Sequence, residues 1–180
     1  MEELIELLER FQHAYTERDF GAAEAFIADV FVEREPVYYG TNPAEQCVGA
    51  ARILRQLGYD WTAWGELKLD FDSLVAHDYG HSADFLITGY VDWNIGEETF
   101  LSRAVMDVKD MVLRGGDSRE LLYELSAVST KMLMEAARGE RHLLPVRMSG
   151  MAVREQGRLR ISHIHLSYPT QVYPDCRAQN

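Results

Sequence analysis

Two imidazole side chains separated by one residue, His163 and His165, are the pair in this chain best placed for chemistry. They lie in the stretch GRLRISHIHLSYP, residues 157–169. Side chains two positions apart on a strand point to the same face, so both imidazoles could contact one ligand or, with a third donor, one metal ion. Neither HExxH nor a carboxylate at a recognised interval supplies that donor. We therefore predict no metal and no cofactor, and we expect the pair to line a ligand pocket. The alternative is a structural pair held by the backbone or by a dimer partner.

A carboxylate in an apolar strand pattern is the second candidate for chemistry. An ionised group there is costly unless it is paired or exposed. If Asp84 faces a cavity beside Tyr90, burial raises its pKa and it can act as a general base. Asp84 and His163 are thus the candidate catalytic residues, and Arg103, in another alternating run, is a candidate ligand-binding residue. The alternative places these charges on a solvent or dimer face.

Aromatic side chains are frequent enough to build a binding site. Each buries a large surface while tyrosine and tryptophan keep a polar tip, which suits a flat or apolar ligand. The alternative is an ordinary aromatic core. The candidate ligand-binding residues are, together with Arg103, His163 and His165, the aromatic residues Tyr15, Tyr38, Trp64 and Tyr90.

The elements that must position these residues follow from periodicity. Gly157 can take the positive φ of a hairpin turn, after which Leu159, Ile161, His163 and His165 alternate onto one face of a closing strand. Helical spacing of apolar residues predicts a first helix over residues 4–18 and a short second one over 20–28. Residues 30–39 contain a proline and are predicted to form a bent strand at a sheet edge.

The middle of the chain predicts one more helix, four more strands and an insertion. Asn42, Pro43 and Glu45 have the pattern of a capped helix start, and Gly58 provides a stop. Alternating runs at residues 66–75, 82–93, 99–109 and 145–154 predict strands. A helix over residues 117–138, with Gly139 after it, interrupts what would otherwise be a hairpin between neighbouring strands.

Composition limits the class of protein. The chain has 180 residues, enough for a single domain over 1–180 with its own core. Its 29 acidic and 18 basic residues give a net charge of -11, which argues against nucleic acid or an anionic membrane as a partner. The N-terminal MEELIELLER lacks the apolar run of a signal peptide or membrane span, so we expect a cytoplasmic protein.

Two segments carry a resemblance to a known family. Residues 38–49, YYGTNPAEQCVG, resemble the G-T-x-P-x-E…G segment of bacterial SnoaL-like proteins, and GRLRISHIHLS resembles their closing strand and that of the association domain of calcium/calmodulin-dependent protein kinase. The resemblance implies an α+β NTF2-like cone, a curved antiparallel β-sheet wrapped around N-terminal helices, with an extra inserted helix near 117–139. It also implies a pocket and often a homodimer. Leu159 replaces the usual tryptophan, and Gly150 occupies the place of the kinase hub's pocket arginine.

Three functions remain open at this point. The first is a dimeric sensory or carrier module that binds a small apolar or aromatic molecule in the cone. The second is a cofactor-independent isomerase, cyclase or dehydratase, with Asp84 or His163 as base and Tyr15 or Tyr90 as donor to an oxyanion. The third is a structural oligomerisation domain. The fold by itself does not choose among them.

Overall fold

The computed structural model describes residues 1–41, 45–119, 121–123, 125–126, 129–130 and 139–168. Its contacts divide the chain into two compact units, one made of residues 1–91 and the chain from 144 onward, the other of residues 92–143. None of the helices formed by the described residues has the length and apolar character needed to cross a membrane. The single domain over 1–180 remains a prediction.

The first unit begins with two helices that follow the predicted pattern. Helix α1, Glu2–Glu17, buries the stripe Leu4, Leu7, Leu8 and Phe11 and ends at Arg18, whose backbone is left-handed. Helix α2, Ala23–Val30, begins three residues later than predicted. Helix α1 packs on the sheet and on α2, so the apolar spacing of both segments is explained by the core that they cover.

The third helix was predicted too early. Residues Asn42 and Pro43 of the expected start lie outside the described residues, and strand β2, Gln46–Val48, occupies the segment where the first helical turns were expected. Helix α3, Ala50–Ala63, begins after Gly49, whose φ of 86° favours glycine. Gly58 lies inside α3 and does not end it. The prediction relied on a capping pattern, whereas pairing of β2 with β1 determines the local structure.

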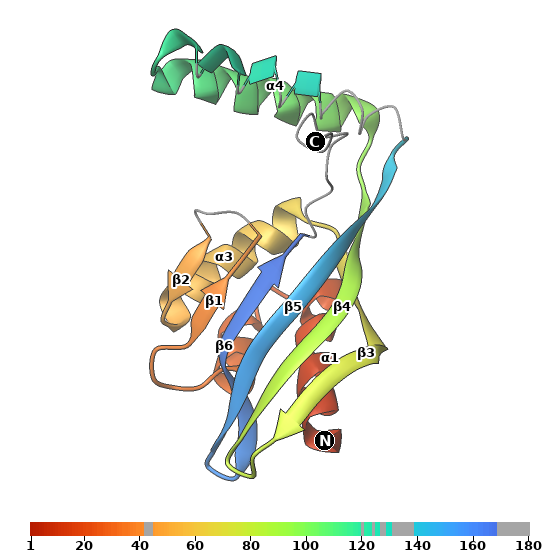
Figure 1. Ribbon diagram of the computed structural model, residues 1–180, viewed down its shortest axis with the longest axis vertical. Coiled ribbons are helices and arrows are strands. Elements are labelled where there is room, and N and C mark those ends of the chain that lie inside the picture. The colour runs from red at the N-terminus through yellow and green to blue at the C-terminus, as the bar shows by residue number, and fades with distance from the viewer. Residues whose placement is uncertain (42–44, 120, 124, 127–128, 131–138, 169–180) are drawn as a thin grey trace, which may run out of the picture. The chain divides into compact units, whose positions relative to one another are not determined.

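A six-stranded sheet forms the other layer of the first unit (Figure 1). Its strands are β1, Val37–Tyr39; β2, Gln46–Val48; β3, Glu66–Asp78; β4, Ser82–Asn94; β5, Arg141–Glu155; and β6, Arg158–Ser167, in the spatial order β2-β1-β6-β5-β4-β3. The sheet is mixed, because β1 runs parallel to β6. Strand β1 lies between β2 and β6 and is internal. The prediction of an edge strand over residues 30–39 was therefore wrong. The predicted strands at 66–75, 82–93 and 145–154 are confirmed.

A bulge in β6 reverses the predicted faces of the closing strand. Ala152 pairs with Ile161 but Met151 pairs with His163, so Ser162 is an extra residue in the ladder. One extra residue exchanges the two faces for everything that follows it. Leu159 and Ile161 are consequently buried with Ile164 and Leu166. The prediction that the two histidines share the face of Leu159 and Ile161 was wrong, because alternation was assumed to continue through Ser162.

The backbone also approaches closely at Gly150, which pairs with Ile164 in the same ladder. A Cβ atom at this position would clash with the backbone carbonyl of His163 and lie 2.8 Å from Cζ of Phe85. Both contacts are far below the separation of non-bonded carbon atoms. Glycine is therefore required for the core side of β5 to come this near to its neighbours.

The second unit contains helix α4, Glu97–Arg114, and corrects the strand predicted at residues 99–109. Alternation and helical spacing coexist in this segment, since Phe100, Ala104 and Val108 are also four residues apart. Acidic residues in the first turn and Arg114 in the last one complement the helix dipole and favour the helix. At the base of the unit the Arg141 guanidinium donates to both carboxylate oxygens of Asp92, at 2.9 and 2.6 Å. Of the helix predicted near 117–139, residues 118–119, 121–123, 125–126 and 129–130 are helical, and the others between 118 and 138 lie outside the described residues.

Candidate functional site

Three polar side chains from three elements meet in the core of the first unit. Tyr15 comes from α1, Tyr38 from β1 and Asp60 from α3. Each tyrosine Oη lies 3.0 Å from Oδ2 of Asp60, and the two Oη atoms are 3.1 Å apart. All three side chains are buried, with Asp60 only 6% exposed. We call this group the Tyr-Tyr-Asp cluster.

The protons of this triangle can be placed in two ways, depending on whether Asp60 is ionised. Three pairwise contacts at hydrogen-bonding distance need three protons, and each phenol supplies one. An ionised Asp60 would leave the contact between the two Oη atoms without a proton. A protonated Asp60 can donate to one tyrosine, which donates to the other tyrosine, which in turn donates to Asp60. The contacts are compatible with both charge states of Asp60, and the two phenols are protonated in each.

Burial shifts the pKa of all three groups in the same direction. Burial raises the pKa of Asp60 above its ordinary value, although hydrogen bonds from Gln56, Tyr15 and Tyr38 act in the opposite direction. Burial is also the main cause that raises the pKa of Tyr15 and of Tyr38 well above the ordinary 10.0. Both phenols are therefore protonated at physiological pH, and each of them donates to Oδ2 of Asp60.

The local sequence explains how Asp60 reaches the core. It lies seven residues after Ile53 and three after Leu57, which are both fully buried, so it falls on the apolar stripe of α3. Gln56, one turn earlier, donates from Nε2 to Oδ1 of Asp60 at 2.8 Å. The sequence interpretation missed both residues. A carboxylate on an apolar helical stripe was the signal that could have identified Asp60.

Aromatic side chains cover the Tyr-Tyr-Asp cluster. The rings of Tyr15 and Trp64 meet edge to face with centroids 5.8 Å apart. Nε1 of Trp64 donates to Oη of Tyr168 at 2.6 Å, and burial raises the pKa of Tyr168 to about 12. Trp61, also against Tyr15, is buried, and its Nε1 has no hydrogen-bond partner in the described part of the chain. A buried N–H without a partner is a position where a water or ligand acceptor is expected.

The structure places the histidines elsewhere. His163 and His165 are exposed, whereas Ile164 and Leu166, which follow them in β6, are buried in the core. The ring of His165 lies edge to face against Tyr39, with centroids 6.4 Å apart. Both imidazoles thus occupy the face of the sheet opposite the Tyr-Tyr-Asp cluster. Across the residues the structure describes, no three His, Cys, Asp or Glu side chains gather as a metal site requires.

The other predicted residues do not join the cluster either. Asp84 is partly exposed, with its carboxylate 2.9 Å from Nδ1 of His77 and 3.0 Å from Oη of Tyr79. These hydrogen bonds lower its pKa, with that from His77 the largest cause, which contradicts the raised pKa expected for a buried base. Tyr90 is 42% exposed, and Arg103 lies on α4 in the second unit. Of the predicted residues, the structure brings together Tyr15, Tyr38 and Trp64.

Comparison with known proteins identifies the fold. No protein-family model matches the sequence, and no curated protein matches it significantly. An NTF2-like superfamily protein from Salmonella enterica serovar Typhimurium is 15% identical, with a TM-score of 0.59 over 96% of this chain and 92% of that one. An NTF2-like protein of unknown function from Pseudomonas putida is 16% identical, with a TM-score of 0.55 over 93% and 85%.

A third solved structure is described as a candidate dehydratase of the NTF2-like family, from Streptomyces avermitilis. It is 12% identical, with a TM-score of 0.55 over 93% of this chain and 95% of that one. At these identities the similarity establishes the fold and not the chemistry. The chain therefore has an α+β NTF2-like cone fold, in which helices pack on a curved, mixed six-stranded sheet.

Proposed function

We propose that this protein binds a small neutral molecule with an aromatic or apolar body and one carbonyl or hydroxyl group. The observation that carries the proposal is the buried Tyr-Tyr-Asp cluster beneath an aromatic cover. A ligand carbonyl would accept a hydrogen bond from Tyr15 or Tyr38, and its body would replace the contacts that Trp64 makes with Tyr15. SnoaL-like ancestry, suggested by residues 38–49 and the closing strand, agrees with such a pocket.

The charge around the cluster supports a neutral ligand. The negative charges of Asp60 and Glu45 both help to raise the pKa of Tyr38 and of Tyr168. Both carboxyl groups therefore lie near the cluster and near the aromatic side chains that cover it. The guanidinium of Arg18 is directed to the backbone carbonyls of Tyr15 and Trp61. A carboxylate ligand would thus meet two acidic groups, and bringing it out of water without a paired cation is costly.

A matched ligand series tests the proposal. Isothermal titration calorimetry with 2-acetylnaphthalene, 2-naphthol and 2-naphthoate presents the same ring with an acceptor, a hydroxyl and an anion. We expect binding of the first two and little of the third. Tyr15→Phe should weaken binding of 2-acetylnaphthalene roughly tenfold, the equivalent of one hydrogen bond. Tyr59→Phe, on the exposed side of α3, is the control and should change nothing. Equal binding of all three compounds, or of none, would contradict the proposal.

The raised pKa of Asp60 favours a second candidate, an acid–base enzyme of the isomerase or dehydratase type. A carboxyl group whose pKa lies nearer to neutrality can take a proton from carbon and return it, while Tyr15 or Tyr38 donates to the developing oxyanion. Asp60 would take the role that the sequence assigned to Asp84 or His163. The candidate dehydratase among the similar structures is consistent with this class.

Hydrogen exchange separates the two candidates. An acid–base enzyme incubated in D₂O with 2-acetylnaphthalene should exchange the methyl hydrogens next to the carbonyl for deuterium, as followed by NMR. Asp60→Asn should abolish this exchange while 2-acetylnaphthalene still binds. Binding without exchange in the unmodified protein would assign the site to recognition alone.

A further inference from the structure

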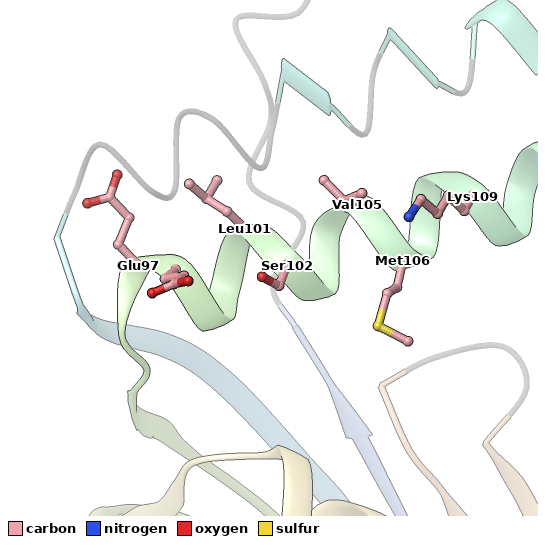
Figure 2. Close-up of a pocket in the computed structure, with 7 residues that line it drawn as sticks. Glu97, Leu101, Ser102, Val105, Met106 and Lys109 are labelled. Atoms are coloured by element: carbon pink, nitrogen blue, oxygen red, sulfur yellow. The ribbon is translucent and has the colours of Figure 1, made fainter.

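We propose that helix α4 is a self-association surface on which the α4 of a second copy of this chain docks antiparallel. The surface is the groove along α4 drawn in Figure 2, and all of its residues belong to the second unit. The groove has a volume of about 640 Å³ and is open to solvent. Leu101 and Val105 lie on one side of it, with Ser102 and Met106 on the other (Figure 2).

The apolar side chains of this surface are strongly exposed to solvent. Val105 is 51% and Met106 is 63% exposed, and Leu101 is partly exposed. The buried side of α4 is a different one, marked by Ala104 and by Phe100, whose ring meets Trp93 with centroids 6.0 Å apart. The groove is therefore a second apolar face that the described part of the unit does not cover.

Two opposite charges lie at the ends of this face. Glu98 and Lys109 both line the groove and are eleven residues apart, which is almost a whole number of helical turns and about 16 Å along the axis. Neither forms an ion pair within the described part of the chain. A carboxylate and an ammonium group are thus presented in the same direction, one at each end of an apolar patch.

This pattern is complementary to itself after a two-fold rotation. When the axis passes between Arg103 and Ala104, Glu98 of each copy lies level with Lys109 of the other. The same rotation places Leu101 against the second copy's Met106, and Ser102 against its Val105. The antiparallel arrangement also sets the positive end of each helix dipole beside the negative end of the other. A partner without this spacing would satisfy one charge at most.

The size of the surface sets the strength of the contact. The groove residues 97–109 span about 18 Å of helix, so the buried area falls at or below the lower end of the range for stable complexes. We expect a reversible dimer that dissociates on dilution from roughly millimolar to micromolar concentration. The net charge of -11 makes two copies of the chain repel each other over most of their surface. We therefore expect the complementary charges Glu98 and Lys109 to determine where the two copies meet.

A charge exchange tests the proposal by sedimentation velocity across a concentration series. Glu98→Lys places two lysines against each other at both ends of the contact, and Lys109→Glu does the same with two glutamates. Each single variant should weaken the dimer roughly tenfold or more, because two attractive pairs become repulsive. The double variant Glu98→Lys with Lys109→Glu restores both pairs and should dimerise within about twofold of the unmodified chain.

Controls keep each outcome decisive. Asp107→Lys changes the net charge by the same amount as Glu98→Lys but lies on another side of the exposed helix, so it should leave the dimer intact. Val105→Glu should abolish the dimer, and circular dichroism melts should show that every variant is folded. A protein that is monomeric at all concentrations, a dimer that no variant affects, or a double variant as weak as the single ones would each overturn the antiparallel α4 contact.

Discussion

The protonation of Asp60 gives the most direct prediction about stability. Burial raises the pKa of this carboxyl group in the folded chain, so the folded state holds the proton more tightly than the unfolded state does. The contribution to stability is therefore complete below about pH 4, the ordinary pKa of aspartate, and is lost as the pH rises toward the raised folded-state pKa. Asp60→Asn removes the titration and keeps a neutral side chain of nearly the same size.

The size of the effect follows from one proton. Linkage allows one titrating group a slope of at most about 1.4 kcal/mol per pH unit in the free energy of unfolding. Asparagine can still accept from a phenol and donate to one, so the two proteins should differ by no more than about 1 kcal/mol near pH 4. Above that pH the unmodified protein should lose stability relative to Asp60→Asn, until the folded-state carboxyl ionises.

Urea unfolding at a series of pH values measures this difference. Subtracting the two curves cancels every group that titrates alike in both proteins, which leaves the contribution of Asp60. Asp60→Ala, which leaves the phenols of Tyr15 and Tyr38 without this partner, should be destabilised by roughly 2 to 5 kcal/mol and confirms that the cluster is formed. Parallel curves for the unmodified protein and Asp60→Asn, or an unmodified protein that becomes more stable than the variant as the pH rises, would show that folding does not raise the pKa of Asp60.

Three further predictions concern other parts of the first unit. Gly150→Ala should lower the free energy of unfolding in urea by roughly 2 kcal/mol or more, because its Cβ meets the carbonyl of His163. Gly58→Ala has open space around it inside α3 and should raise the free energy of unfolding by about 0.5 to 1 kcal/mol. Equal effects of the two variants would contradict the close approach at Gly150. Asp84→Asn and His163→Ala should leave the affinity for 2-naphthol unchanged in calorimetry, since both side chains lie away from the cluster, and a loss of binding would return them to the site. Cys47 is buried, and burial raises the pKa of its thiol, so a thiol reagent should label it only as fast as the chain opens. Mass spectrometry of the labelled peptides separates Cys47 from Cys176, and rapid labelling of the Cys47 peptide in the native protein would show that Cys47 is accessible.

The sequence was sufficient for the architecture where periodicity was long. The apolar stripe of α1 and the alternation in β3, β4 and β5 predicted their elements, and the closing strand pointed to the cone fold. It was insufficient where two patterns compete. Residues 99–109 alternate and also have helical spacing, and the end charges of α4 that favour the helix were not weighed.

The candidate site shows the same limit at single residues. Tyr15 and Tyr38 were expected in a pocket because of their type, but Asp60 was missed because only apolar residues were counted on the stripe of α3. His163 and His165 were assigned to the wrong face because Ser162 adds one residue to β6, and a bulge leaves no clear mark in an alternating strand. Contacts between distant segments, and not local spacing, determined both outcomes.

Carbon-13 NMR of the Asp60 carboxyl group, identified by its absence in Asp60→Asn, measures whether this group is buried with Tyr15 and Tyr38 and whether a ligand binds there. We predict a resonance that titrates at higher pH than ordinary aspartates and that moves when 2-acetylnaphthalene binds, because the ligand joins the hydrogen-bond network of Tyr15, Tyr38 and Asp60. An Asp60 signal that titrates as an exposed aspartate does, or that stays in place when the ligand saturates the protein, would contradict it.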